Sequence, residues 1–155
     1  MKAAEKEAIR WMQQGEDDFK FVQWVLSEKV FFDKGCFIAQ QAGEKSLKAC
    51  LYALGQRRVM GHSLFELSHE LSKRDSRFSA LVDGAKQLDR FYIPTRYPNG
   101  IPGGSPFQVF DRQDLKKAVD ALEELTLTLQ KTFDAMVHYP FIHARLTHLR
   151  SSVKD

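Results

Sequence analysis

Residues 33–55, DKGCFIAQQAGEKSLKACLYALG, decide the fold. Small and apolar residues recur along this stretch at alternating intervals of three and four, which is the period of a helix with one buried face. Asp33 can cap the start of such a helix, and Gly55 is placed to end it. Because the stripe runs the full length of the segment, we predict a central helix over residues 33–54. The stripe consists of Cys36, Ala39, Gly43, Leu47, Cys50 and Leu54.

Periodic apolar residues and capping residues predict further helices on both sides of the central one. Before it, small and apolar residues follow the same rhythm. After it, Ser63 and Glu66 stand at the spacing of a capping box. Ser76 can cap a fourth helix, and Asp111 opens a last long one. The expected helices span residues 4–27, 33–54, 63–73, 76–92 and 111–139.

Residues 93–110, IPTRYPNGIPGGSPFQVF, interrupt the helical pattern with a long loop. This segment holds four of the five prolines and three of the nine glycines, which excludes a helix or a regular strand. Loops of this length are usually functional or disordered, and the interleaved apolar side chains favour a loop that packs. The sequence therefore predicts an all-α, antiparallel up-and-down helical bundle of four to five main helices, with an ordered Pro/Gly loop before the last long helix.

A chain of 155 residues has the size of one domain. We expect a bundle over residues 1–137 and a tail over 138–155 that can form one short helix. The net charge of +3, from 23 basic and 20 acidic residues, is too balanced for strong general nucleic-acid binding. No apolar run approaches the roughly 20 residues of a membrane span, and the N-terminus lacks the apolar core of a signal peptide. We therefore expect a cytoplasmic protein without a membrane partner.

Neither the cysteines nor the histidines indicate a metal site. Cys36 and Cys50 fall on one predicted helix, 14 residues or about 21 Å apart, which excludes a disulfide between them. Both cysteines lie on the apolar face, as small core residues do. The five histidines include no pair four residues apart with supporting carboxylates. We expect no metal and no resident cofactor.

The polar flank of the central helix is the first candidate for a binding site. Gln41, Lys45, Lys48 and Tyr52 follow one another at intervals of four, three and four, so two ammonium groups and an amide lie along one surface. Such a surface can hold a phosphate. The alternative is an ordinary solvated face that carries an ion pair between Glu44 and Lys48.

The Pro-rich loop contributes a second candidate group. Arg96 lies between Tyr92 and Tyr97 in a segment stiffened by two prolines. A planar guanidinium on a rigid loop suits phosphate or base recognition, and either tyrosine can stack on a base. The alternative is structural, because Arg96 can also pair with a carboxylate such as Asp89 and pin the loop to the bundle.

A third candidate is His62, which comes just before the capped helix at 63–73. With Arg57 or Arg58 it can bind an anion near that helix N-terminus. Alternatively it can pack on Leu67 as a hydrophobic staple. The sequence has no glycine-rich phosphate loop, nucleophile turn or paired carboxylates, so the residues alone indicate no reaction. They indicate an anion site built from the central helix, the linker after it and the Pro-rich loop.

Three separated motifs, taken in order, resemble the HEPN domain (higher eukaryotes and prokaryotes nucleotide-binding). They are CFIAQQAGEKSLKA at 36–49, HSL at 62–64, and Leu88-Asp89 followed by YIPTRYP at 92–98. The resemblance covers about residues 5–137. It implies an up-and-down helical bundle, often dimeric, that binds nucleotides and often acts beside a minimal nucleotidyltransferase. A similar domain closes the large chaperone-like protein sacsin.

The resemblance implies a nucleotide-binding and dimerisation module that is non-catalytic by itself, with GTP or ATP as the expected ligand. Its partner would be a nucleotidyltransferase or a chaperone-like domain. The residues add one further point, because Trp11 and Trp24 lie outside the main apolar stripe of their helix and are candidate anchors of a homodimer interface. The family's shared positions fall on Gln41, Lys45, Lys48, His62, Tyr92, Arg96 and Tyr97.

Two alternatives stay open. Many HEPN proteins are metal-independent ribonucleases that use an Arg and a His with four to six residues between them, and here four residues separate Arg57 from His62. However, Arg58 stands where that motif usually has Asn, Asp or His. The other alternative is a purely structural homodimerisation domain in which the Pro-rich loop is only a brace.

Overall fold

The computed structural model describes residues 2–137, and this part of the chain is all-α without a strand, as the sequence predicts. The predicted tail helix within 138–155 lies outside the described residues. The described residues include two 3-10 helices, η1 (Ser76–Leu81) and η2 (Pro98–Gly100). The α-helices are α1 (Ala3–Glu28), α2 (Phe32–Ala53), α3 (Leu64–Arg74), α4 (Val82–Asp89), α5 (Pro106–Val109) and α6 (Arg112–Val137).

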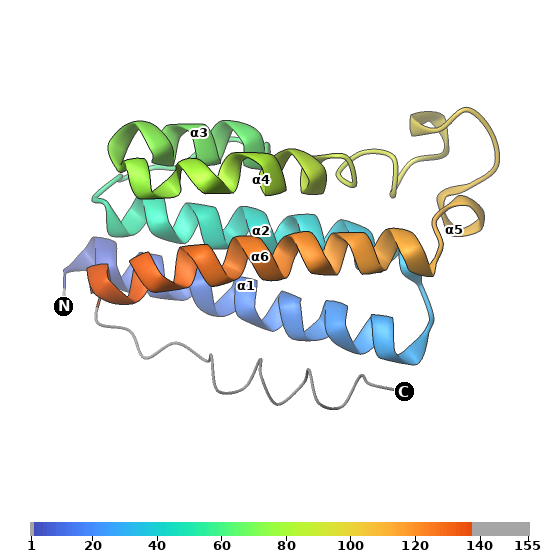
Figure 1. The fold of residues 1–155 in the computed structure, drawn as a ribbon, viewed down its shortest axis with the longest axis horizontal. Helices are drawn as coiled ribbons and strands as arrows, with labels where there is room; N and C mark the ends of the chain where they lie inside the picture. Colours follow the sequence, from blue (N-terminus) through green and yellow to red (C-terminus); the bar gives the residue numbers. More distant parts are fainter. Residues whose placement is uncertain (1, 138–155) are drawn as a thin grey trace.

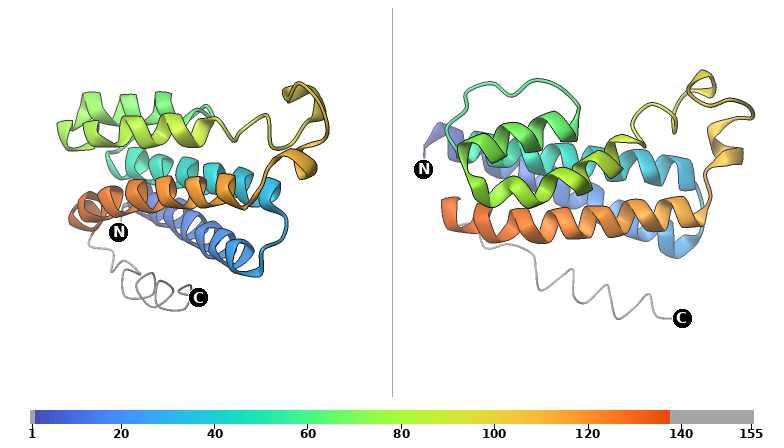
Figure 2. Two further views of the ribbon diagram at one scale, coloured as in Figure 1. Left: turned by 45° about the vertical axis from the view of Figure 1, so that its right-hand side comes forward. Right: turned by 45° about the horizontal axis from the view of Figure 1, so that its top comes forward.

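The helices form three layers (Figure 1). α2 and α6 lie side by side in the middle, α1 covers them on one side, and α3 with α4 covers them on the other (Figure 2). α2 packs against α1, α3, α4 and α6, which confirms the prediction of a central helix. The Pro/Gly loop and α5 lie at the same end of the bundle as the turn between α1 and α2.

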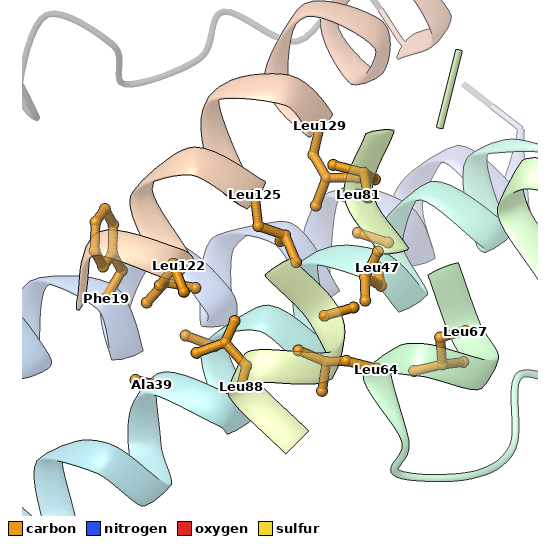
Figure 3. Packing of buried hydrophobic residues seen from close by; sticks show 14 of the residues in the cluster. Phe19, Ala39, Leu47, Leu64, Leu67, Leu81, Leu88, Leu122, Leu125 and Leu129 are labelled. Carbon is orange, nitrogen blue, oxygen red and sulfur yellow. The ribbon is translucent and has the colours of Figure 1, made fainter. Parts of the chain in front are cut away.

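Apolar side chains from every layer meet in one core around α2, with Phe19 from α1 and leucines from the other layers (Figure 3). α6 contributes Leu122, Leu125 and Leu129, and each of them is at most 2% exposed. Leu47 of α2 and Leu64 of α3 are fully buried opposite them. Because burying one leucine side chain is worth about 1.5–3 kcal/mol, these contacts provide much of the driving force that joins the layers.

Two glycines set how closely the neighbouring helices approach α2. A Cβ atom on Gly15 of α1 would lie 2.9 Å from Oγ of Ser46 and 3.1 Å from the Ala42 carbonyl oxygen. A Cβ atom on Gly43 would lie 2.7 Å from Cδ2 of Leu64. Gly43 belongs to the apolar stripe predicted for the central helix, and the two glycines let α1 and α3 pack directly on the α2 backbone.

The turn before α2 differs from the prediction. α2 begins at Phe32, and its N-cap is Phe31, whose φ of 50° is left-handed, so Asp33 is not the cap. A second left-handed residue, Lys29, has a φ of 58°, and together these two residues reverse the chain within a very short turn. Asp33 instead lies in the first helical turn, buried and ion-paired with Lys34 at 2.8 Å.

The segment predicted as one helix over 76–92 is divided. Its first part is the 3-10 helix η1, and α4 ends at Asp89. The N-cap is Asp75 rather than Ser76, because the Asp75 carboxylate accepts the backbone N–H of Arg77 at 3.0 Å. The chain cannot continue as a helix past Asp89 for long, since Pro94 disfavours a helical residue before it and lacks an N–H.

The segment 93–110 also differs from the prediction, because it contains the short helices η2 and α5, each with a proline at its start where no N–H is needed. Three predictions of helix ends are confirmed. Gly55 has a φ of 89° and ends α2. Ser63 caps α3 by accepting the backbone N–H of Glu66 at 3.2 Å. Asp111 accepts the backbone N–H groups of the first turn of α6. Within residues 2–137, none of the helices is both long and apolar enough to span a membrane.

Candidate functional site

Asp89, at the end of α4, fastens the start of α3. Its carboxylate accepts the backbone N–H of Leu64 at 2.8 Å and that of Phe65 at 3.0 Å. It also accepts the hydroxyl of Ser63 at 2.8 Å. These bonds satisfy N–H groups that a helix start leaves without an intrahelical partner. The Asp89 carboxylate is therefore bonded to the start of α3, and in the described structure it forms no ion pair with Arg96.

Glu44 of α2 is a buried carboxylate with three donors around it. Lys48 Nζ lies 2.8 Å from Oε1, and His62 Nδ1 lies 3.2 Å from the same oxygen. The Gln41 amide donates to Oε2 at 3.2 Å. Glu44 is 4% exposed and Lys48 is 5% exposed. The predicted pair between Glu44 and Lys48 therefore exists, but it is buried within the bundle rather than on a solvated face.

Lys48 also faces α1. Its Nζ lies 5.2 Å from the centre of the Trp11 ring, which is the geometry of a cation–π contact. Tyr52, one turn further along α2, packs on the same tryptophan with ring centres 5.8 Å apart. Trp11 thus covers the ammonium group from outside, which explains why a lysine on the polar flank of α2 is buried.

Gln40 is a residue of this network that the sequence did not reveal. Its side chain is fully buried, and its amide nitrogen donates to the His62 carbonyl at 2.9 Å and to Asp89 at 3.4 Å. Its amide oxygen accepts from Gln41 at 2.8 Å. The only sequence signal was a polar residue beside the buried Ala39. Gln40 joins α2, the linker and the end of α4.

His62 is held at two sides of its ring. Nδ1 meets the Glu44 carboxylate, and the ring stacks on Tyr92 with centres 5.7 Å apart and planes 21° apart. The side chain is nevertheless 62% exposed. A neutral imidazole that donates from Nδ1 has Nε2 as its acceptor. The predicted contact with Leu67 as a staple is replaced by the stack on Tyr92.

Arg96 lies among three aromatic rings. Its Cζ is 4.5 Å from the centre of the Tyr92 ring, 4.6 Å from that of Phe37 and 5.0 Å from that of Tyr97. Its Nε donates to the Tyr92 carbonyl at 2.8 Å. Within the described chain its terminal NH₂ groups make no hydrogen bond or ion pair. The two tyrosines were predicted, whereas Phe37 was missed because it adjoins the apolar stripe of α2.

Lys45 lies apart from these groups. Its ammonium forms an ion pair with Asp18 of α1. It also lines an open hollow of about 510 Å³ between α1 and α2, where the other lining residues are Glu7, Arg10, Trp11, Gln13 and Gln14. The structure therefore joins six of the seven predicted site residues in one network and places Lys45 on the side of α2 that faces α1.

Arg57 and Arg58 are exposed in the linker between α2 and α3, while Val59 beside them is buried and anchors that linker. Neither arginine has an ion pair with any residue from 2 to 137. In the same part of the chain, no three potential metal ligands among His, Cys, Asp and Glu gather at one place. The assembled groups can thus bind an anion through the terminal NH₂ groups of Arg96 and stack on a planar ring through the exposed Tyr97.

Comparisons with known proteins show the family and the fold. The HEPN domain family model matches residues 8–132. The structure is similar to that of TT1696 from Thermus thermophilus, with a TM-score of 0.74, 32% identity, and 81% of this chain and 97% of that chain covered. It also shares the fold of ST0689, an archaeal HEPN homologue, with a TM-score of 0.66, 24% identity, and 86% and 99% of the two chains covered. No curated protein matches the sequence.

Proposed function

This chain belongs to the HEPN domain family, and we propose that it is a nucleotide-binding and dimerisation module that is non-catalytic by itself. The ligand is a nucleotide such as GTP or ATP. The module works beside a partner protein or domain, for which a nucleotidyltransferase or a chaperone-like domain is the expected class.

The environment of Arg96 is the observation that supports this proposal. Its Nε is used by the Tyr92 carbonyl, and the three rings hold the guanidinium plane in place. The terminal NH₂ groups keep the paired donors that suit two phosphate oxygens. Because the orientation is fixed before a ligand arrives, little side-chain entropy is lost on binding.

The other groups have distinct roles in the proposed site. Tyr97 is 50% exposed and offers a ring on which a base can stack. His62 offers the exposed edge of its ring beside Tyr92, whereas Gln41 acts indirectly, because its amide already donates to Gln40 and to Glu44. Lys48 acts indirectly, since its charge is balanced by Glu44 and it holds that carboxylate under His62. Lys45 serves only a ligand long enough to reach past Lys48 towards α1.

Thermal unfolding of the full chain with GTP, ATP or inorganic phosphate tests the proposal, using Arg96→Gln and the matched control Arg90→Gln. Arg90 is an exposed arginine at the C-cap of α4 without a described partner, so both variants lose one charge. A ligand that binds only the folded state at 100 times its Kd adds about 2.7 kcal/mol of stability. We expect the nucleotide to raise the melting temperature of the wild type and of Arg90→Gln, and not that of Arg96→Gln.

Two outcomes would contradict the nucleotide site. If Arg96→Gln responds to nucleotide as the wild type does, the site lies elsewhere. If the wild type shows no shift at millimolar nucleotide, the alternative of a purely structural homodimerisation domain is the better account. The melting temperature of Arg96→Gln without ligand separates loss of binding from loss of folding.

One specific observation favours the ribonuclease alternative. The buried Glu44 carboxylate holds Nδ1 of the exposed His62 ring, which is how an imidazole is kept in one tautomer for proton transfer at Nε2. In that reading Arg57 stabilises charge on the scissile phosphate. Incubation of the protein with RNA in the presence of a chelator tests it. Cleavage that His62→Ala abolishes and that the control His69→Ala retains would favour the enzyme, and its absence at high protein concentration would remove it.

A further inference from the structure

The outer face of α1 carries a second stripe of residues that points away from the bundle. Its six members recur at intervals of four, three, four, three and four, and all six are exposed. This spacing is that of the a and d positions through which two helices pair. The stripe consists of Arg10, Gln14, Asp17, Phe21, Trp24 and Glu28.

Two large aromatic residues stand in the middle of this stripe without cover from the rest of residues 2–137. Trp24 is 53% exposed and Phe21 is 43% exposed. Their rings lie side by side, with centres 6.1 Å apart, so they form one apolar projection. α1 forms an outer layer, with the α3–α4 layer on the opposite side of the bundle (Figure 1). Exposed tryptophans of this kind are typical anchors of protein interfaces.

The same face of α1 also has a hollow. The space of about 510 Å³ that Lys45 borders is lined on α1 by Glu7, Arg10, Trp11, Gln13 and Gln14. Gln14 lies 10 residues before Trp24, or about 15 Å along the helix. A projection and a hollow on one surface fit together when two copies meet about a two-fold axis, because each copy then offers both parts.

When two copies of α1 run antiparallel with their residues 19 opposite each other, every member of the stripe on one copy faces a member of the stripe on the other. In that register Gln14, at the hollow, opposes Trp24 of the second copy, and Asp17 opposes Phe21. Arg10 opposes Glu28, which gives two opposite-charge pairs per dimer. A parallel pairing would instead bring Arg10 against Arg10 and Glu28 against Glu28. The charges therefore favour the antiparallel arrangement.

Arg10 is available for such a pair. It is bonded to Glu7 at 3.0 Å, but its side chain is 77% exposed. An exposed ion pair three residues apart on one helix is weak and exchanges partners at little cost. The Trp24 ring of the second copy would also find two cations at the hollow, Arg10 and Lys45, that can lie over its face.

We propose that a second copy of this chain docks on the outer face of α1, antiparallel, with Trp24 of each copy seated at the hollow beside Gln14 of the other. This inference rests on the dimerisation part of the proposed function and specifies its surface. It shares only Lys45 with the proposed nucleotide site, whose other residues lie on α2, the linker and the Pro-rich loop.

Analytical ultracentrifugation of the full chain tests the surface, with Trp24→Gln and the matched control Phe107→Gln. Phe107 on α5 is 68% exposed, so the control removes an exposed aromatic ring at another place. We expect the wild type and Phe107→Gln to dimerise alike, and Trp24→Gln to raise the dissociation constant at least about tenfold. A Trp24→Gln variant that dimerises as the wild type does would overturn the proposed surface while dimerisation stands.

Charge exchange tests the register. Arg10→Glu and Glu28→Arg should each weaken the dimer, and the double variant should regain the wild-type dissociation constant, because the opposite-charge pairs are restored with their ends exchanged. A double variant weaker than either single one would overturn the antiparallel register. A wild type that stays monomeric while its Trp24 indole resists collisional quenching would overturn the whole inference and show that another part of this chain covers the face.

Discussion

His62 and Lys48 share one oxygen of Glu44: Nδ1 of the imidazole lies 3.2 Å from Oε1, and the ammonium lies 2.8 Å from the same atom. Lys48 comes from the same helix as Glu44, whereas His62 comes from the linker that leads into α3. One buried carboxylate therefore balances a buried cation and holds in place the imidazole of the candidate site. This relationship makes the stability of the bundle and the position of His62 depend on the same residue.

Glu44→Met should lower the free energy of unfolding by about 3 kcal/mol, because it leaves the ammonium of Lys48 buried without a countercharge. Urea unfolding at neutral pH measures the change. The double variant Glu44→Met/Lys48→Met should recover most of the loss, since replacing both members of a buried pair by apolar residues is often neutral. A double variant as unstable as Glu44→Met would show that packing, rather than charge, controls this position.

Asp89→Ala should cost about 1–2 kcal/mol, because it removes the acceptor of two backbone N–H groups at the start of α3. Asp83→Ala is a suitable control on the same helix. Asp83 is exposed, and its ion pair with Lys86 is a long surface contact of 3.5 Å. Hydrogen exchange gives a second readout. We expect faster exchange at Leu64 and Phe65 in Asp89→Ala, and equal stability of the two variants would contradict the assignment.

Gly43→Ala and Gly84→Ala should change stability in opposite directions. At Gly43 the new Cβ would lie 2.7 Å from Leu64 Cδ2 and 3.2 Å from Leu88 Cδ1, so we expect a loss of about 1–3 kcal/mol from overpacking. At Gly84, within α4, the nearest atom is 3.9 Å away. There the alanine should add about 0.5–1 kcal/mol through its higher helix propensity. Thermal or urea unfolding of both variants measures the contrast, and a loss at both positions would contradict it.

Cys36 and Cys50 should not react with thiol reagents in the folded protein. Both are free and fully buried, and burial raises the pKa of each thiol far above its ordinary value. In the unfolded chain the thiol pKa is about 8.5. Labelling at pH 8 should therefore follow unfolding by urea, and fast labelling of the native protein would show that one thiol is accessible.

The same burial gives a pH dependence. Burial raises the pKa of both thiols in the folded protein, so folding favours their protonated form. Their contribution to the free energy of unfolding is complete at a pH below the pKa of the unfolded thiols. It is lost as the pH rises above about 8.5, where the thiols of the unfolded chain lose their protons. The slope approaches about 1.4 kcal/mol per pH unit for each thiol. Comparison with Cys36→Ala/Cys50→Ala between pH 8 and pH 9.5 isolates this contribution. An unchanged slope in that variant would assign the dependence to other groups.

The elements that could be predicted from the sequence are those encoded within a few residues. Ser63 and Glu66 are three residues apart, and Gly55 needs only its own left-handed backbone. The apolar stripe of the central helix is likewise read from one segment. The signal was weaker at 76–81, where a 3-10 helix forms, because that geometry has no side-chain period that distinguishes it from an α-helix over a few residues.

The candidate site was predicted as a set of residues but not as a geometry. His62 meets a carboxylate 18 residues away, and Leu64 meets one 25 residues away, so no local pattern indicates either bond. The pair of Glu44 with Lys48 was visible at its spacing of four, whereas its burial depends on Trp11 from another helix. Gln40 and Phe37 were missed for the same reason, because the groups that they contact, His62 and Asp89 for Gln40 and Arg96 for Phe37, lie far away in the sequence.

The middle position of α6 has a consequence for synthesis of the chain. α6 is the last described helix to be made, yet its leucines complete the core between the α1–α2 hairpin and the α3–α4 layer. Until residues 112–137 leave the ribosome, the apolar faces of the earlier helices remain uncovered. Nascent chains that expose such surface are prone to aggregate. The growing polypeptide is therefore most vulnerable, and most in need of a chaperone, in the interval before residues 112–137 have left the ribosome.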